Sequence, residues 1–253
     1  MSDTGNDQPV WVELSSTDAA VSRDFYSRLF GWNIEVIEDP QYRGYGMARD
    51  GGDDVAGIGP QQAPGAPTNW GVYIGTDNVD DLAGKVTAAG GTVVAQPFDV
   101  GDQGRMAVFM DPTGAFISGW QAGGMRSFGQ GRQNTFGWAE LSTRDLERAL
   151  PFYEQVFGWG ARRSGEGDGL YVEFQHDGES IAGALPMPSM VPAGVPNYWT
   201  VYFNADDLEA THRRAIELGA RELVAPQAFP GGRFSMVTDP QGGSFGLLAM
   251  GAR

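Results

Sequence analysis

The hydrophobic pattern of the chain changes period close to its N-terminus. Residues 11–16, WVELSS, alternate between apolar and polar positions as a half-buried strand does. In residues 19–30 the apolar side chains recur every three or four positions, which is the period of an amphipathic helix. Asp18 is a common residue at a helix start, and Gly31 suits a left-handed helix end. The pattern predicts a strand and then a helix whose aromatic residues pack in a core.

The same alternation of periods continues downstream. A helix is predicted from near Asn78 to the Gly90–Gly91 pair, because an amide cap precedes the apolar period and glycines end it. A Pro/Gly-rich loop, QQAPGAP, precedes one of the strands. The strands predicted around this helix are residues 44–49, 54–60, 70–75, 92–97, 105–110 and 115–120.

The chain repeats this pattern. FYSRLFGW at residues 25–32 returns as FYEQVFGW at 152–159, and four other segments recur in the same order. Two long copies indicate a duplicated domain and not a solenoid, which needs three or more short repeats. We predict an N-terminal domain at 8–122, a linker at 123–135 that is rich in glycine and polar residues, and a C-terminal domain at 136–250. The recurring pairs are WVELSSTD and WAELSTRD, VAGIGP and IAGALP, WGVYIGTD and WTVYFNAD, and GRMAVFMDPTGAFISG and GRFSMVTDPQGGSFGL.

Composition narrows the functional classes. The formal net charge is −15, which disfavours binding to nucleic acid or to an anionic membrane. Cysteine is absent, so thiolate catalysis and cysteine-ligated metals are excluded. The start of the chain lacks the pattern of a signal peptide, and no apolar stretch has the length of a membrane span. A cytoplasmic protein is expected.

The repeated segments resemble the vicinal oxygen chelate superfamily, which includes glyoxalase I, extradiol dioxygenases and bleomycin-resistance proteins. The residues that carry the resemblance are TDAAVSRDFYSRLFGW and RDLERALPFYEQVFGW, with DPTG at 111–114 and DPQG at 239–242. More narrowly, the chain is similar to tandem glyoxalase-like proteins of actinobacteria. The resemblance implies an α+β fold of two tandem domains, each made of two βαβββ modules that form a cup-shaped mixed sheet with helices outside. It also implies a pseudo-dimer within one chain, with a homodimer as a further alternative.

Members of this family that bind metal use a His/His/Glu set, and the chain departs from it in both copies. The resemblance places these ligands at Trp11, Gly71 and Ser118 in the first copy, with a further carboxylate position near Gly57. Glycine and tryptophan are not ligands for zinc, iron, nickel or manganese. Only two histidines exist, His176 in an expected hairpin turn and His212 in an expected helix, and structural roles are the simpler interpretation. We expect no metal and no cofactor. The corresponding positions of the second copy are Trp138, Thr200, Gly246 and Gly183.

Side-chain alternation along the strands predicts what lines each cup instead. Apolar and aromatic walls with few polar anchors are typical of a small-molecule site, although simple core filling is an alternative. Arg105 and Arg233 precede matching strands and either bind an anionic ligand or, more simply, pair with nearby acids. The predicted ligand-binding residues are Trp11, Trp138, Met106, Phe116, Ser118, Trp120, Thr200, Asn204, Phe234 and Met236.

One carboxylate per copy, Glu13 and Glu140, falls on the predicted inner face. Burial raises the pKa of a carboxyl group and can make it a general base, and Tyr73 or Tyr202 could then donate a hydrogen bond to a developing oxyanion. A structural carboxylate or a ligand anchor is the alternative.

Two functional hypotheses from different classes are favoured. The first is binding of a small, largely apolar or aromatic organic molecule without metal. The second is a metal-independent lyase or isomerase that uses Glu13 or Glu140 as base and Tyr73 or Tyr202 as hydrogen-bond donor. A metal-dependent glyoxalase or dioxygenase is a third hypothesis. The residues at the metal-ligand positions of the family argue against it.

Overall fold

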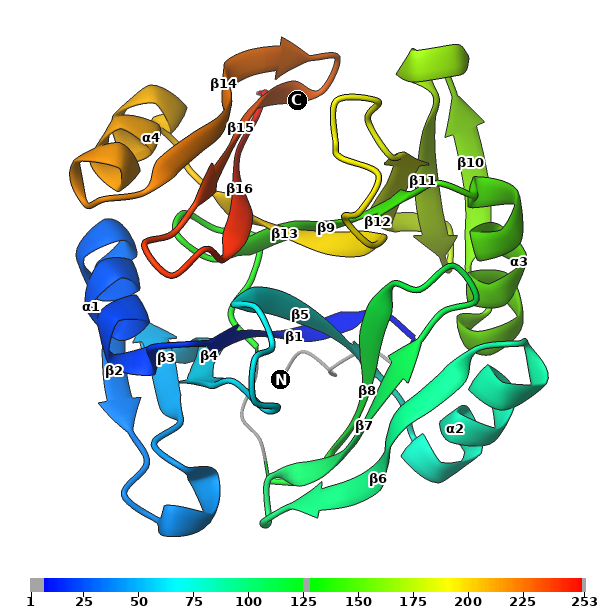
Figure 1. The fold of residues 1–253 in the computed structure, drawn as a ribbon, viewed down its shortest axis with the longest axis horizontal. Helices are drawn as coiled ribbons and strands as arrows, with labels where there is room; N and C mark the ends of the chain where they lie inside the picture. The colour runs from blue at the N-terminus through cyan, green and yellow to red at the C-terminus, as the bar shows by residue number, and fades with distance from the viewer. Residues whose placement is uncertain (1–6, 125–127, 252–253) are drawn as a thin grey trace. The chain divides into compact units, whose positions relative to one another are not determined.

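The computed structural model describes residues 7–124 and 128–251, and within them the two repeats have the same order of elements (Figure 1). The first repeat contains β1 (Pro9–Ser16), α1 (Ala19–Phe30), β2 (Asn33–Val36), β3 (Gly46–Asp50), β4 (Asp53–Pro60), β5 (Asn69–Gly75), α2 (Val79–Ala88), β6 (Thr92–Val100), β7 (Gly104–Met110) and β8 (Phe116–Ala122). The second contains β9 (Phe136–Thr143), α3 (Leu146–Phe157), β10 (Gly160–Ser164), β11 (Tyr171–His176), β12 (Glu179–Pro186), β13 (Tyr198–Asn204), α4 (Leu208–Glu217), β14 (Arg221–Phe229), β15 (Gly232–Thr238) and β16 (Ser244–Met250).

Each repeat forms one mixed, open sheet of eight strands, as expected for an α+β fold of two tandem domains. The strand orders are β2-β3-β4-β1-β5-β8-β7-β6 and β10-β11-β12-β9-β13-β16-β15-β14. The pairs β1–β4 and β5–β8 are parallel, whereas the outer pairs of each half are antiparallel. Each half of a sheet is therefore one βαβββ module.

The predicted helix boundaries are confirmed. Asp18 caps α1 by accepting hydrogen bonds from the amides of Ala20 and Val21, both at 3.1 Å. Gly31 ends α1 with φ of 76°, a conformation that costs residues with a Cβ more than glycine. Asn78 caps α2 at the predicted position. None of the helices in the described part of the chain is long and apolar enough to cross a membrane.

One pair of strands was missed by the sequence analysis. β2 and its counterpart β10 follow the first helix of each repeat. Both are short edge strands with mostly exposed side chains, so their sequences carry little hydrophobic pattern. They complete the three strands expected in each first module.

The chain also divides into two compact units that cut across the repeats. We call them the α1–α4 unit, mainly residues 11–71 and 201–251, and the α2–α3 unit, mainly residues 72–124 and 139–200. In each unit two helices from different repeats lie side by side (Figure 1). Each unit thus combines the first module of one repeat with the second module of the other, which agrees with the predicted pseudo-dimer.

A buried relay of three side chains joins the two modules of the α1–α4 unit. The indole nitrogen of Trp70 donates to the hydroxyl of Tyr26 at 2.9 Å, and that hydroxyl donates to Oδ2 of Asp239 at 3.0 Å. The other carboxylate oxygen accepts the amides of Gln241 and Gly243, both at 2.8 Å, which closes the DPQG turn. The tyrosine of one repeat is therefore bonded to the turn of the other.

The α2–α3 unit contains the same relay with the repeats exchanged. Trp199 donates to the Tyr153 hydroxyl at 3.0 Å, and Tyr153 donates to Oδ2 of Asp111 at 2.9 Å. Oδ1 of Asp111 accepts the amides of Thr113 and Ala115 and closes the DPTG turn. We call these two arrangements the Trp–Tyr–Asp relays.

Both relays lie within aromatic cores. Tyr26 and Tyr153 are fully buried, and each stacks on the tryptophan that follows its helix, at ring-centre distances of 6.0 and 5.5 Å. Burial raises the pKa of each tyrosine well above its usual value, and the neighbouring aspartate raises it further. The hydroxyls therefore stay protonated and available as donors. The prediction that the aromatic residues of FYSRLFGW pack in the core is confirmed.

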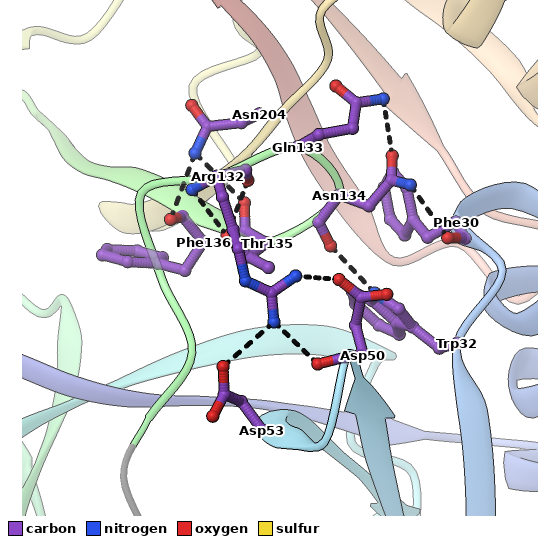
Figure 2. Close-up of polar contacts among 10 residues, drawn as sticks. All are labelled: Phe30, Trp32, Asp50, Asp53, Arg132, Gln133, Asn134, Thr135, Phe136 and Asn204. Atoms are coloured by element: carbon purple, nitrogen blue, oxygen red, sulfur yellow. Dashed lines mark hydrogen bonds and ion pairs between the residues drawn. The ribbon is translucent and has the colours of Figure 1, made fainter.

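The segment after residue 127 is bonded closely to the first module of the α1–α4 unit (Figure 2). The predicted linker covers residues 123–135, of which 125–127 lie outside the described residues. The Arg132 guanidinium pairs with Asp50 and Asp53. The Asn134 carbonyl accepts the Trp32 indole N–H at 2.8 Å, and its amide donates to the Phe30 carbonyl at 3.0 Å. Residues 128–135 thus fasten the connection to the end of α1 and to the β3–β4 turn.

The relays predict a clear stability difference between tyrosines. Tyr26→Phe or Tyr153→Phe leaves a buried aspartate oxygen and a buried indole N–H without their partner, so we expect each to lower the free energy of unfolding by about 1–3 kcal/mol. Urea unfolding followed by circular dichroism measures this. The control is Tyr42→Phe, at a partly exposed tyrosine, which should change stability by less than about 0.5 kcal/mol. Equal effects at the three positions would contradict the structural role of the relays.

Candidate functional site

The first strand of each repeat has one face toward the core and one face away from the helices. On β1, Val12 and Leu14 are fully buried, whereas Glu13 and Ser15, which alternate with them, are partly exposed. Glu13 is the register partner of Gly57 on β4. Trp11 shares the face of Glu13, as side-chain alternation predicts. On β9, Glu140 is likewise partly exposed and is the register partner of Gly183 on β12.

Tyr45 is a residue of this face that the sequence analysis missed. The Trp11 indole N–H donates to the Tyr45 hydroxyl at 3.2 Å. The phenol lies over the backbone of Gly57 and Gly59, where a Cβ on Gly57 would overlap the hydroxyl. Two glycines at alternate positions of one strand are the signal that could have indicated a large neighbouring side chain.

In the α2–α3 unit, the β5–β8 half of the first sheet brings several predicted ligand-binding residues together. Tyr73 is the register partner of Ser118, and Met106 is the partner of Trp120. Phe116 lies two positions before Ser118 and is 51% exposed. Ile117 and Gly119 alternate with these residues, and a Cβ on Gly119 would contact Leu82 of α2. We call the face away from α2 the β5–β8 face.

In the α1–α4 unit, the equivalent β13–β16 face of the second sheet is filled differently. Tyr202 is the register partner of Gly246, and its ring lies directly over that glycine. The Tyr202 ring also contacts Phe234, with ring centres 6.4 Å apart. Phe234 pairs with Leu248 and Met236 with Gly246 across β15 and β16.

The remaining predicted site residues fall into separate units. Thr200, buried on β13, belongs to the α2–α3 unit, as does Glu140. Glu13 lies in the α1–α4 unit, whereas Tyr73 lies in the α2–α3 unit. The predicted pairing of a glutamate with a tyrosine as base and hydrogen-bond donor therefore stays a prediction, and so do the roles of Trp138 and Asn204.

The residues at the family's metal positions do not fit its His/His/Glu set. The Tyr45 phenol takes the space beside Gly57, and the Tyr202 ring takes the space beside Gly246, so neither position has room for a carboxylate ligand. Among the described residues, no group of three or more His, Asp or Glu side chains is placed to hold a metal ion. Trp11 at the first ligand position offers only an N–H donor, which is already bonded.

Both histidines and both repeated arginines are explained by local pairing. His212 is buried on α4, with its ring nitrogens 3.1 Å from the Ser235 hydroxyl and 2.9 Å from a Glu222 carboxylate oxygen, so it fastens the helix to β14 and β15. His176 ends β11 before the turn, and its Nε2 lies 3.6 Å from an Asp177 carboxylate oxygen. Arg105 pairs with Asp80 and Asp99, and Arg233 pairs with Glu209.

The close approach of Tyr202 to Gly246 predicts a local stability cost. Gly246→Ala forces the buried ring to move, and we expect it to lower the free energy of unfolding by about 1–3 kcal/mol. Gly84→Ala is the matched control, because nothing lies within 4 Å of its added Cβ on the exposed side of α2. That change should raise stability by about 0.5–1 kcal/mol. Calorimetric unfolding of both variants provides the measurement, and an unchanged Gly246→Ala protein would show that the Tyr202 ring is not held in place.

Comparison with known proteins identifies the family that both repeats match. Residues 8–118 and 135–245 each match the Glyoxalase/Bleomycin resistance protein/Dioxygenase superfamily. The chain is 39% identical over 249 residues to "Putative glyoxylase CFP32" of Mycobacterium tuberculosis, covering 95% of this chain and 94% of the relative. It is 36% identical over 258 residues to the anthracycline biosynthesis protein DnrV of Streptomyces peucetius, covering 96% and 93%.

Solved structures share the fold at low sequence identity. The Mn(II)-bound glyoxalase from Novosphingobium aromaticivorans aligns with a TM-score of 0.68 at 17% identity, over 96% of this chain and 82% of that one. The 2,3-dioxygenase LapB from Pseudomonas sp. KL28 aligns with a TM-score of 0.66 at 14% identity, over 97% and 92%. With both repeats matched and relatives aligned over nearly their full length, the chain belongs to the Glyoxalase/Bleomycin resistance protein/Dioxygenase superfamily.

Proposed function

We propose that this protein binds a small, largely apolar or aromatic organic molecule, without a metal ion, on the sheet faces that point away from the helices. The observation that carries the proposal is the β5–β8 face, where large apolar side chains stay accessible beside buried polar groups. Phe98 and Phe116 are 45% and 51% exposed, while Ser118 and Trp120 are each 7% exposed. Apolar walls with a few polar anchors are what a small organic ligand requires.

Two further observations support this proposal. Tryptophan or glycine stands at six of the eight positions where the family's metal-binding members carry ligands, and Ser118 and Thr200 stand at the other two. DnrV, a relative along most of the chain, is named for the biosynthesis of anthracyclines, which are fused-ring aromatic compounds. Aromatic side chains pack well against flat rings.

The proposal is tested by binding of two neutral probes, acetylnaphthalene and ethylnaphthalene, after treatment with a chelator. We expect saturable binding that does not change when zinc or manganese is added. Phe116→Ser removes accessible ring surface and should weaken binding by about fivefold, since about 1 kcal/mol of contact is lost. Equilibrium dialysis measures the dissociation constants.

The matched control is Val36→Ser, which changes an apolar residue of similar exposure on β2 in the α1–α4 unit. It should leave probe binding unchanged. No saturable binding of either probe, or binding that appears only with added metal, would contradict the proposal.

A second candidate function is a metal-independent lyase or isomerase. The observation in its favour is that each repeat keeps a partly exposed glutamate, Glu13 or Glu140, at the same register position opposite a glycine of the neighbouring strand. The carboxylate would remove a proton from a carbon atom next to a carbonyl group, and the electron pair would move to the carbonyl oxygen. Tyr73 or Tyr202 would donate a hydrogen bond to that oxygen.

This alternative predicts a specific kinetic loss. In any proton-transfer reaction that the protein catalyses, Glu13→Gln or Glu140→Gln should lower kcat by about 100- to 10,000-fold with little change in KM. Glu35→Gln, on the exposed strand β2, is the control and should retain full turnover. Unchanged kcat in both glutamine variants would remove the base role and leave binding as the function.

A further inference from the structure

Trp120 on β8 carries a buried polar group that the fold does not use. The side chain is 7% exposed, and its indole nitrogen has no hydrogen-bond partner among residues 7–124 and 128–251. Other buried indoles in these residues are bonded, for example those of Trp70 and Trp199 in the Trp–Tyr–Asp relays. A buried N–H without a partner is rare in proteins, and each case calls for an explanation.

The surroundings of Trp120 place this N–H on the β5–β8 face. Across neighbouring strands, Phe98, Met106, Trp120 and Gly75 are successive register partners and form one row. The indole edge lies over Gly104, where a Cβ would come within 2.6 Å of the ring. Gly75 and Gly104 have no side chains, so neither position covers the indole. Met106 is the direct neighbour, and its unbranched side chain can change rotamer at low cost.

The equivalent row of the second repeat is built differently. Gln227, Phe234, Leu248 and Asn204 occupy it. Leu248 replaces the tryptophan and has no polar atom to satisfy. Asn204 replaces the glycine, and its amide donates to the carbonyls of Thr135 and Phe136 at 3.4 and 3.3 Å. The two repeats therefore differ at the one row where the first has an unused donor.

We propose that the Trp120 indole N–H donates a hydrogen bond to an oxygen acceptor of a flat aromatic ligand, such as a ring carbonyl, bound on the β5–β8 face. The β13–β16 face does not bind this class of ligand, because Leu248 stands where the first repeat has Trp120 and because its Tyr202 and Phe234 rings pack on each other. This inference rests on the proposed binding function and adds the acceptor group and the repeat that binds it.

The test compares acetylnaphthalene with ethylnaphthalene, which differ chiefly in one carbonyl oxygen. Seven tryptophans give indole N–H signals in nitrogen-15 NMR spectra, and Trp120→Phe identifies the signal of Trp120 by its loss. We expect acetylnaphthalene to shift that signal downfield at saturation, with one probe bound per chain. Ethylnaphthalene should bind more weakly, by about three- to tenfold, which is the range for one hydrogen bond.

Trp120→Phe keeps the aromatic surface and removes the N–H, so it should bind both probes equally. Leu248→Met is the matched control at the equivalent position of the second repeat, and it should keep the preference for acetylnaphthalene. A thermal unfolding curve verifies that each variant is folded. If Trp120→Phe itself fails to fold, the unchanged protein still decides the matter, because equal binding of the two probes or two equivalent bound probes per chain would overturn the inference.

Three outcomes of the binding measurements would overturn the inference while leaving the proposed function intact. These are equal binding of both probes to the unchanged protein, a carbonyl preference that persists in Trp120→Phe, and two equivalent bound probes per chain. A Trp120 signal that neither probe moves, despite binding, would show that the N–H is not a ligand donor. Absence of binding by either probe would overturn the proposed function and the inference together.

Discussion

The structure depends on the hydrogen bond between a buried tyrosine of one repeat and a buried aspartate of the other. An aspartate that is 2% exposed would be costly in an apolar core unless its oxygens were bonded, and each relay bonds both of them. One oxygen closes the DPxG turn, and the other receives the phenol of the partner helix. The same carboxylate therefore shapes a turn in its own module and positions a helix of another module. Each relay therefore bonds a module of one repeat directly to a module of the other.

Much of this arrangement can be predicted from the sequence, because local signals are strong. Asp18 and Gly31 mark the ends of α1, and the duplicated segments indicate two related sheets. The partner of Tyr26, however, is not specified by sequence. DPTG at Asp111 and DPQG at Asp239 are nearly identical turns, and a choice between them depends on how modules pack in three dimensions. Short, exposed β2 was missed for the opposite reason, since it has almost no hydrophobic pattern.

The sequence predicts which residues share the face of the candidate site better than it predicts how their polar groups are hydrogen-bonded. Strand alternation placed Met106, Ser118 and Trp120 on one face, as the register shows. It did not reveal that the Tyr45 phenol fills the space beside Gly57, because the contact joins residues of different strands whose spacing depends on the fold. Nor did it distinguish bonded from unbonded polar groups. Trp11 and Trp120 look alike in sequence, but the first indole is bonded to Tyr45 and the second has no partner among the described residues.

The crossed Trp–Tyr–Asp relays also constrain how such a chain can evolve. Each repeat contributes the tyrosine of one unit and the aspartate of the other, so deletion of either repeat would leave a phenol and a carboxylate unmatched in apolar cores. If recombination replaced one repeat, the incoming repeat would have to keep both the relay tyrosine and the relay aspartate. The sheet faces carry no such match between repeats, so their residues can differ, as Trp120 and Leu248 do at equivalent positions. The relays therefore constrain the interiors of both repeats together, whereas each sheet face can change its residues, and with them its specificity, independently.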